Sequence, residues 1–210
     1  MLEKIKKIFC KQKNTKDNSD IITIIDEMFN SMNSDIITLL IGEDFVEFEN
    51  IILDTITDYR EELKNNTGFI LPAVHVLSDY ELQENEFILK ARGKDIERVF
   101  AVPNQTEIKK EIKNALKNLY KNNLEEIFTY EIAEKYVNAV QKNLLWTIWN
   151  ISSMYTITDI RNVLIQILKN DKSIKDINYI FEKFADYTLE LESCNRLSPQ
   201  KIAQKLCLLL

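Results

Sequence analysis

The only histidine of the chain, His75, is the side chain best suited to acid–base chemistry near neutral pH. It lies between Val74 and Val76 in an alternating run that is typical of a strand, and its nearest candidate partners are Ser78 and Asp79. Neighbouring positions on a strand point to opposite faces, and no catalytic motif surrounds the histidine. We therefore interpret His75 as a structural residue, and Asp79 as a turn carboxylate that accepts backbone N–H groups.

Four carboxylates gather around one predicted helix start: Glu125, Glu126, Glu131 and Glu134. Acidic side chains suit the positive end of a helix dipole, and without histidine or cysteine partners these four do not form a zinc site. The three glycines are far apart in the sequence and do not form a phosphate-binding loop. We therefore predict a protein that is not an enzyme and that binds no cofactor and no metal.

Composition limits the class of partner. Hydrophobic residues make up 45% of the 210 residues and charged residues 29%, which is typical of a globular protein. The net charge of −6 argues against nucleic acid, because phosphate binding requires a basic surface. The three cysteines are odd in number and lack C-x-x-C spacing, so they indicate neither a disulfide framework nor a zinc site. We therefore expect the reducing environment of the cytoplasm. The partners of this chain are then expected to be proteins, further copies of the same chain among them.

The most aromatic stretch contains Trp146 and Trp149, which would share one helix face because they are three residues apart. Tyr155 follows closely. Packing in the core is the default interpretation, since large apolar residues are usually buried. If these three side chains are exposed instead, they are candidate hot spots of an interaction surface.

The N-terminal leader combines Lys4, Lys6 and Lys7 with apolar residues such as Phe9. A weak membrane-surface helix on anionic lipid is one interpretation. A frayed basic terminus and a helix docked on a partner are the alternatives. Contact with a membrane would be peripheral, at the inner face of the cell membrane, because no apolar run approaches the ~20 residues that a spanning helix needs.

The elements that position these residues divide the chain into three parts. Residues 1–35 hold the leader, a polar linker and a short helix. Residues 36–103 are predicted to form a small α+β subdomain, and residues 104–210 a helical subdomain. The predicted fold class is therefore α+β, with a small sheet subdomain followed by an all-helical one.

Within the second part, β-branched and alternating runs predict four strands, at 36–41, 69–77, 87–92 and 96–102. An apolar stripe from Ile52 to Leu63 predicts a helix that ends near Gly68. In the third part, hydroxyl side chains mark five predicted helix starts: Thr106, Thr129, Thr156, Ser173 and Ser198. Those at Thr156 and Ser173 are each followed three residues later by an aspartate, which predicts capping boxes.

Three stretches, in this order, resemble the cytoplasmic part of the FlhA-type export-gate proteins of flagellar and virulence-associated type III secretion systems. The first runs from Gly68 through Pro72 to Asp79. The second is an Asn-Glu-aromatic strand that ends at Gly93, and the third covers residues 163–187. The resemblance implies a module that contacts secretion components or further copies of itself, without ATP or metal.

Two departures from that family are visible. The family's membrane domain is absent, and between Pro103 and Thr106 there is no room for its second cytoplasmic subdomain. That subdomain helps to form the family's docking groove for export chaperones, so no chaperone-binding residues are carried over. Because the chain opens with Met1 and a basic leader, we expect a free-standing relative. The alternative is a regulatory or membrane-peripheral protein that retains the fold without an export role.

Overall fold

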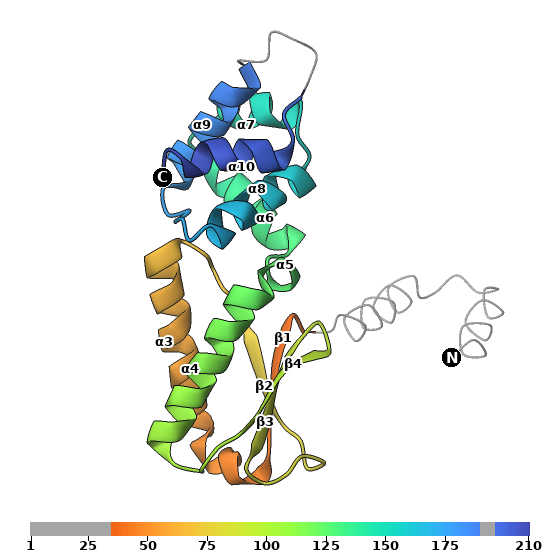
Figure 1. Cartoon of the computed structure of the whole chain (residues 1–210), viewed down its shortest axis with the longest axis vertical. Coiled ribbons are helices and arrows are strands. Elements are labelled where there is room, and N and C mark those ends of the chain that lie inside the picture. Colours follow the sequence, from red (N-terminus) through yellow and green to blue (C-terminus); the bar gives the residue numbers. More distant parts are fainter. Residues whose placement is uncertain (1–34, 190–195) are drawn as a thin grey trace, which may run out of the picture. The chain divides into compact units, whose positions relative to one another are not determined.

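A computed structural model describes residues 35–189 and 196–210 (Figure 1). The predictions for the leader, including Lys4, Lys6, Lys7 and Phe9, concern residues outside this part of the chain, as does the short helix predicted within residues 1–35.

Four strands form one mixed sheet in the order β2-β1-β3-β4. Their bounds are β1 Ile37–Ile41, β2 Val74–Ser78, β3 Glu86–Ala91 and β4 Lys94–Phe100. β1 pairs in parallel with β2 and antiparallel with β3, and β4 pairs antiparallel with β3. The predicted strands at 36–41, 87–92 and 96–102 thus correspond to observed ones.

The second strand is shorter than predicted because it begins only at Val74. The two residues that open the predicted strand hydrogen-bond outside any sheet. The Phe69 N–H donates to Thr67 Oγ1 at 3.1 Å, and the Ile70 N–H donates to the Tyr136 hydroxyl at 3.1 Å. These contacts hold the segment away from a neighbouring strand.

Two long helices lie side by side against one face of the sheet (Figure 1). α3, Glu49–Thr67, follows a short 3-10 helix, η1, at Glu43–Phe48, and connects β1 to β2. Its predicted end is confirmed, because Gly68 caps it in the left-handed region at φ 79°. α4, Gln105–Asn122, begins directly after the sheet. Its cap is Asn104 rather than the predicted Thr106, since Asn104 Oδ1 accepts the Glu107 N–H at 3.0 Å.

The remaining helices follow with short connections. They are α5 Leu124–Ile127, α6 Tyr130–Gln141, α7 Leu145–Ser152, α8 Ile157–Lys169, α9 Ile177–Leu189 and α10 Pro199–Cys207. Thr129 caps α6, a capping box at Thr156 opens α8, and Ser198 precedes α10 with Pro199 at its first position, as predicted. With this arrangement the predicted α+β fold class is confirmed.

The capping box predicted at Ser173 is wrong. α9 begins four residues later, at Ile177, and Asp176 Oδ1 caps it by accepting the Tyr179 N–H at 3.2 Å. The reason is a tertiary contact, in which the Ile174 N–H donates to the Thr67 carbonyl at the end of α3 at 2.7 Å. A residue held there cannot join the first turn of α9.

Residues on both sides of Pro103 share one apolar core. Phe69 stacks on Phe128 with ring centroids 5.3 Å apart. Beside this pair, the Tyr136 hydroxyl donates to the Gly68 carbonyl at 2.7 Å while it accepts the Ile70 N–H. One side chain of α6 therefore satisfies two backbone groups of the segment between α3 and β2.

Tyr136→Phe is expected to lower the free energy of unfolding by about 1–2 kcal/mol, because it leaves the Gly68 and Ile70 backbone groups without their buried partner. The measurement is urea unfolding followed by circular dichroism. Tyr130→Phe is the matched control, since its ring is largely exposed and the same atom is removed. Equal stability of the two variants would contradict the prediction.

The same side chain predicts a pH dependence. Burial raises the pKa of Tyr136 to about 12, helped by Tyr120 and opposed by the Ile70 hydrogen bond. A raised pKa in the folded state means that the stabilising contribution is complete below the unfolded-state value of 10.0 and is lost as pH rises toward 12. Between these pH values the wild type should lose stability more steeply than Tyr136→Phe.

Candidate interaction surface

α7 is the short helix that carries the two tryptophans. Ile148 and Ile151 lie on its inner face and are buried, and they anchor the helix on α6 and α9. Trp146 and Trp149 lie on the other face. Apolar residues thus occupy both faces of the helix at a spacing of three, and the face that is buried is the one with Ile148 and Ile151.

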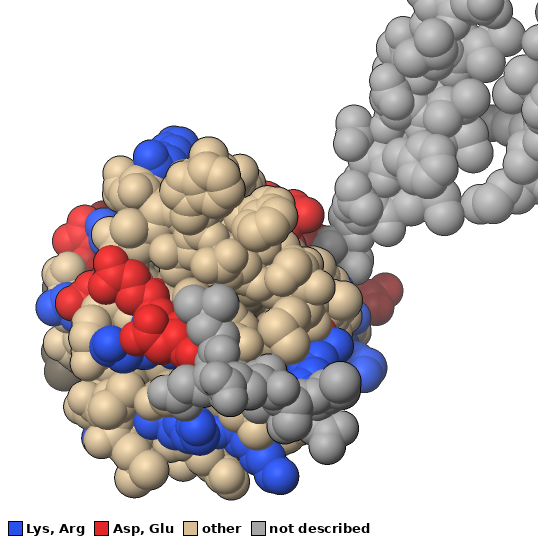
Figure 2. Space-filling model, turned by 90° about the horizontal axis from the view of Figure 1, so that it is seen from above, with Lys and Arg blue, Asp and Glu red and all other residues tan. Residues whose placement is uncertain are grey.

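The default interpretation, that the tryptophans pack in the core, is wrong. Trp146 is 74% exposed and Trp149 is 63% exposed, and Leu145 beside them is also exposed. The two indole rings meet edge to face, with centroids 6.1 Å apart and planes at 80°. We call Leu145, Trp146 and Trp149 the tryptophan face. Figure 2 views the end of residues 35–210 that carries α7, and shows a broad area of uncharged side chains there.

Tyr155 does not belong to this surface, which corrects its assignment from the sequence. It is 3% exposed, and its ring packs edge-on against Phe184 with centroids 4.9 Å apart. The Arg196 guanidinium lies over the ring at 4.5 Å, and the hydroxyl donates to the Leu197 carbonyl at 3.1 Å. Burial raises the pKa of the Tyr155 hydroxyl. Tyr155 therefore fastens the start of α10 to the core.

His75 lies on the sheet face opposite α3, in one cross-strand row with Thr38 and Lys90. It is exposed, and its Nε2 is 3.4 Å from Asp35 Oδ1. Asp79 Oδ1 accepts the Glu81 N–H at 2.9 Å, the turn role predicted for it. The structure therefore places His75 in an exposed polar row of the sheet. Asp79, its nearest carboxylate in the sequence, is hydrogen-bonded within a turn.

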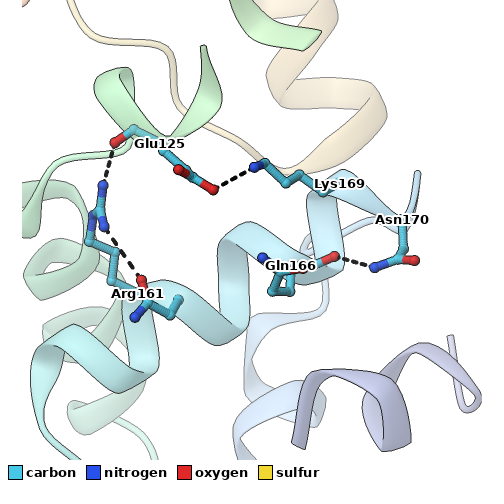
Figure 3. A network of polar contacts seen from close by, with 6 residues as sticks. Glu125, Arg161, Gln166, Lys169 and Asn170 are labelled. Atoms are coloured by element: carbon cyan, nitrogen blue, oxygen red, sulfur yellow. Dashed lines mark hydrogen bonds and ion pairs between the residues drawn. The ribbon is translucent and has the colours of Figure 1, made fainter. Parts of the chain in front are cut away.

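Glu125 and Glu126 of α5 make ion pairs with basic side chains of other elements, and Figure 3 shows the contacts of Glu125. Glu125 pairs with Lys169 of α8 at 2.5 Å, and the hydrogen bond from Lys169 lowers the pKa of the Glu125 carboxyl. Arg161 of α8 donates to the carbonyls of Glu125 and Phe128. On the sheet side, Arg92 donates to the Glu126 carbonyl at 2.9 Å. These bonds join α5 to α8 and to the β3–β4 turn.

Residues 35–189 and 196–210 contain no candidate metal site and no candidate membrane-spanning helix. Their His, Cys, Asp and Glu side chains form no group of three that could hold a metal ion. None of their helices is both long and apolar enough to cross a membrane.

Sequence reasoning missed a second group of exposed apolar side chains, at the end of the sheet beside η1. Its members are Val46, Tyr80, Phe100 and Val102. They come from three separate segments, so no local periodicity connects them. The sequence signal that could have indicated an exposed apolar residue here is the strongly acidic stretch 42–49, in which Val46 lies among four carboxylates.

No protein-family model matches the sequence, and no curated protein matches it significantly. Solved structures do match. The Chlamydia pneumoniae CdsV protein aligns with a TM-score of 0.69 at 11% identity, over 81% of this chain and 65% of CdsV. The Shigella flexneri MxiA protein aligns with a TM-score of 0.62 at 15% identity, over 83% of this chain and 64% of MxiA.

The nonameric EscV cytosolic domain from the type III secretion system aligns with a TM-score of 0.65 at 12% identity, over 84% of this chain and 63% of that domain. This chain thus spans just under two thirds of the length of the structures that it matches. The resemblance seen in the sequence is confirmed for the fold: over 81–84% of its length, this chain shares the fold of solved cytosolic domains of type III secretion export-gate proteins.

Proposed function

We propose that this chain is a non-enzymatic protein-interaction module of a type III or flagellar-type export apparatus, which contacts secretion components or further copies of itself through the tryptophan face. The observation that carries the proposal is the exposure of Trp146 and Trp149 on a helix of this fold. Tryptophan is rarely left in water without a role, because it offers a large apolar area together with an N–H donor.

The tryptophan face has the properties of a binding hot spot. Two adjacent indoles present a rigid, concentrated apolar area, and few torsions must be fixed when a partner binds. Ile148 and Ile151, buried on the opposite side of α7, hold the face in place before binding. An apolar patch of this kind, in a broad uncharged area with charged side chains around it, favours a partner with a complementary apolar pocket (Figure 2).

Two comparisons support the class of partner. CdsV has been solved in complex with CdsO, and the EscV cytosolic domain has been solved as a nonamer. Both properties belong to those longer proteins. Their relevance here is that proteins with the shared fold are found in both kinds of assembly, which supports the two kinds of partner proposed for this chain.

The test is affinity purification of the full chain from its native cell, with Trp146→Ala/Trp149→Ala as the variant. Removing two hot-spot side chains should weaken capture of the bound partner, or of further copies of the chain, at least 100-fold, since each tryptophan contributes about 2 kcal/mol or more. The matched control is Leu208→Ala, which truncates another exposed apolar side chain of the helical part.

Export ATPase, chaperone or gate components recovered by the wild type and lost only by the tryptophan variant would support the proposal. Recovery of none of them, together with liposome binding that depends on residues 1–19, would support the alternative of a regulatory or membrane-peripheral protein. Turnover of a small substrate by the pure protein would refute the non-enzymatic proposal.

A further inference from the structure

The end of the sheet beside η1 brings three chain segments together. β1, β2 and β4 end there and β3 begins there, as shown by the strand pairs Ile41–Ser78, Ile41–Phe87 and Glu86–Phe100. The segments that continue from these strand ends surround an open hollow of about 540 Å³, which is lined by Glu43, Asp44, Val46, Glu47, Tyr80 and Pro103. We call it the acidic hollow.

Backbone hydrogen bonds fix the segments around the hollow. The Gly42 N–H donates to the Glu86 carbonyl at 2.8 Å, and the Ala101 N–H donates to the Asn85 carbonyl at 3.1 Å. A Cβ added at Gly42 would lie 2.2 Å from the Gln83 carbonyl oxygen, so these two segments approach as closely as glycine allows. The shape of the hollow is therefore set by the backbone, before any partner binds.

The charge of these segments has one sign. Residues 42–49, 79–85 and 101–104 contain no lysine or arginine and seven carboxylates, which are Glu43, Asp44, Glu47, Glu49, Asp79, Glu81 and Glu84. Within the described part of the chain, none of the seven makes an ion pair with a basic side chain. Elsewhere carboxylates such as Glu62 and Asp159 are paired with lysine or arginine. The walls of the hollow thus carry a negative field and no positive charge of their own.

This charge limits what the hollow can bind. It is not a metal site, because no three histidine, cysteine, aspartate or glutamate side chains of the described residues lie close enough together to hold a metal ion. A negative field also repels the phosphates of nucleic acids and of anionic lipids. A positively charged segment of a protein is the complementary partner.

Apolar side chains lie among the carboxylates. Tyr80 is 80% exposed, and Val46, which lines the hollow with it, is exposed as well. Phe100 and Val102, just before Pro103 in the chain, are also exposed. A purely polar basic segment would leave this apolar area in water. The surface therefore fits a segment in which lysine or arginine is mixed with apolar residues.

We propose that the acidic hollow is a docking site for a basic, apolar segment of another protein. Lysine or arginine side chains of that segment pair with Glu43, Asp44 and Glu47, and its apolar side chains cover Val46 and Tyr80. This surface is distinct from the tryptophan face on α7. One copy of the chain can therefore hold two partners together.

The test is a fluorescence anisotropy titration of the full chain with three short labelled peptides, in which lysine alternates with leucine, lysine with serine, or glutamate with leucine. The Lys-Leu peptide should bind. The Lys-Ser peptide should bind about tenfold more weakly, because it leaves the apolar area uncovered. The Glu-Leu peptide should not bind, and a raised salt concentration should weaken binding of the Lys-Leu peptide. Equal affinities for the Lys-Leu and Lys-Ser peptides would overturn the proposal.

Charge reversal locates the peptide. Glu43→Lys/Glu47→Lys should weaken Lys-Leu binding at least tenfold and should create binding of the Glu-Leu peptide, a gain that a misfolded variant would not show. The matched control is Glu61→Lys/Glu134→Lys, which makes the same change in net charge at two exposed carboxylates outside the hollow and should alter the affinity less than twofold. Equal weakening by the two charge reversals would overturn the proposal, as would failure of Glu43→Lys/Glu47→Lys to bind the Glu-Leu peptide.

Two further variants separate this surface from the tryptophan face. Tyr80→Ser should weaken Lys-Leu binding to the level of the Lys-Ser peptide and leave Lys-Ser binding unchanged. Trp146→Ala/Trp149→Ala should bind the Lys-Leu peptide like the wild type, so the failure of one proposal leaves the other standing. Loss of peptide binding in the tryptophan variant would place the peptide on the tryptophan face and overturn the proposal.

Discussion

Leu164→Asp is expected to abolish cooperative thermal unfolding of the helical part of the chain. Leu164 is 1% exposed within α8, which packs against α6 and α10. An unpaired carboxylate at such a site costs about 3–5 kcal/mol, and the lost leucine packing adds about 2–5 kcal/mol. The sum is comparable to the whole stability of an ordinary domain, about 5–15 kcal/mol.

The control for this variant is Thr158→Asp. It introduces the same charge into the same helix, but at an exposed position in the first turn, where a carboxylate favours the helix dipole. Thermal unfolding followed at 222 nm should show a broad, non-cooperative signal for Leu164→Asp and a wild-type transition for Thr158→Asp. A melting temperature of Leu164→Asp near that of the wild type would contradict the prediction.

Gly68→Ala should have the second largest effect, a loss of about 3 kcal/mol of unfolding free energy. Gly68 has a φ of 79°, which costs a non-glycine residue about 1–2 kcal/mol. In addition, an alanine Cβ would lie 2.6 Å from the Lys175 backbone nitrogen and 2.8 Å from the Ile174 carbonyl carbon. This contact is between backbone segments, so no side-chain movement relieves it, and overpacking adds about 1–3 kcal/mol.

Gly93→Ala separates the two contributions. Gly93 has nearly the same φ, 77°, but an added Cβ meets nothing within 4 Å. For a chain of this size, 1 kcal/mol lowers the melting temperature by about 2–4 °C. Calorimetry should therefore show a decrease of about 6–12 °C for Gly68→Ala and about half of that or less for Gly93→Ala. Equal decreases in melting temperature for the two variants would mean that the close packing of the α8–α9 connection on Gly68 does not add to the destabilisation.

Much of the fold could be predicted because its signals are local. Strands β1, β3 and β4 follow from β-branched or alternating residues, and the starts of α6, α8 and α10 follow from Thr129, Thr156 and Ser198. Each of these helix starts contains its own capping partner. The residue types of the strands suit a pleated, half-buried surface, although their hydrogen-bond partners lie on other strands. The resemblance that the solved structures confirm for the fold was indicated by three residue stretches in order: Gly68 to Asp79, the strand that ends at Gly93, and residues 163–187.

Predictions failed where a distant segment competes for a backbone group. Ser173 does not cap α9, because Ile174 is bonded to Thr67 at the end of α3. Ile70 does not enter β2, because the Tyr136 hydroxyl accepts its N–H. Both partners are more than 60 residues away in the sequence, so no local pattern could reveal them.

The sequence by itself determined the element types, the α+β class and the pairing of two tryptophans on one helix face. It could not determine which face of α7 is buried, because isoleucines and tryptophans recur at the same spacing on opposite sides. Packing against α6 and α9 decided this by burying Ile148 and Ile151, which left Trp146 and Trp149 in solvent. Tertiary structure likewise buried Tyr155 beneath Arg196. The physical reason is that periodicity reports which residues share a face, whereas burial depends on what packs against that face.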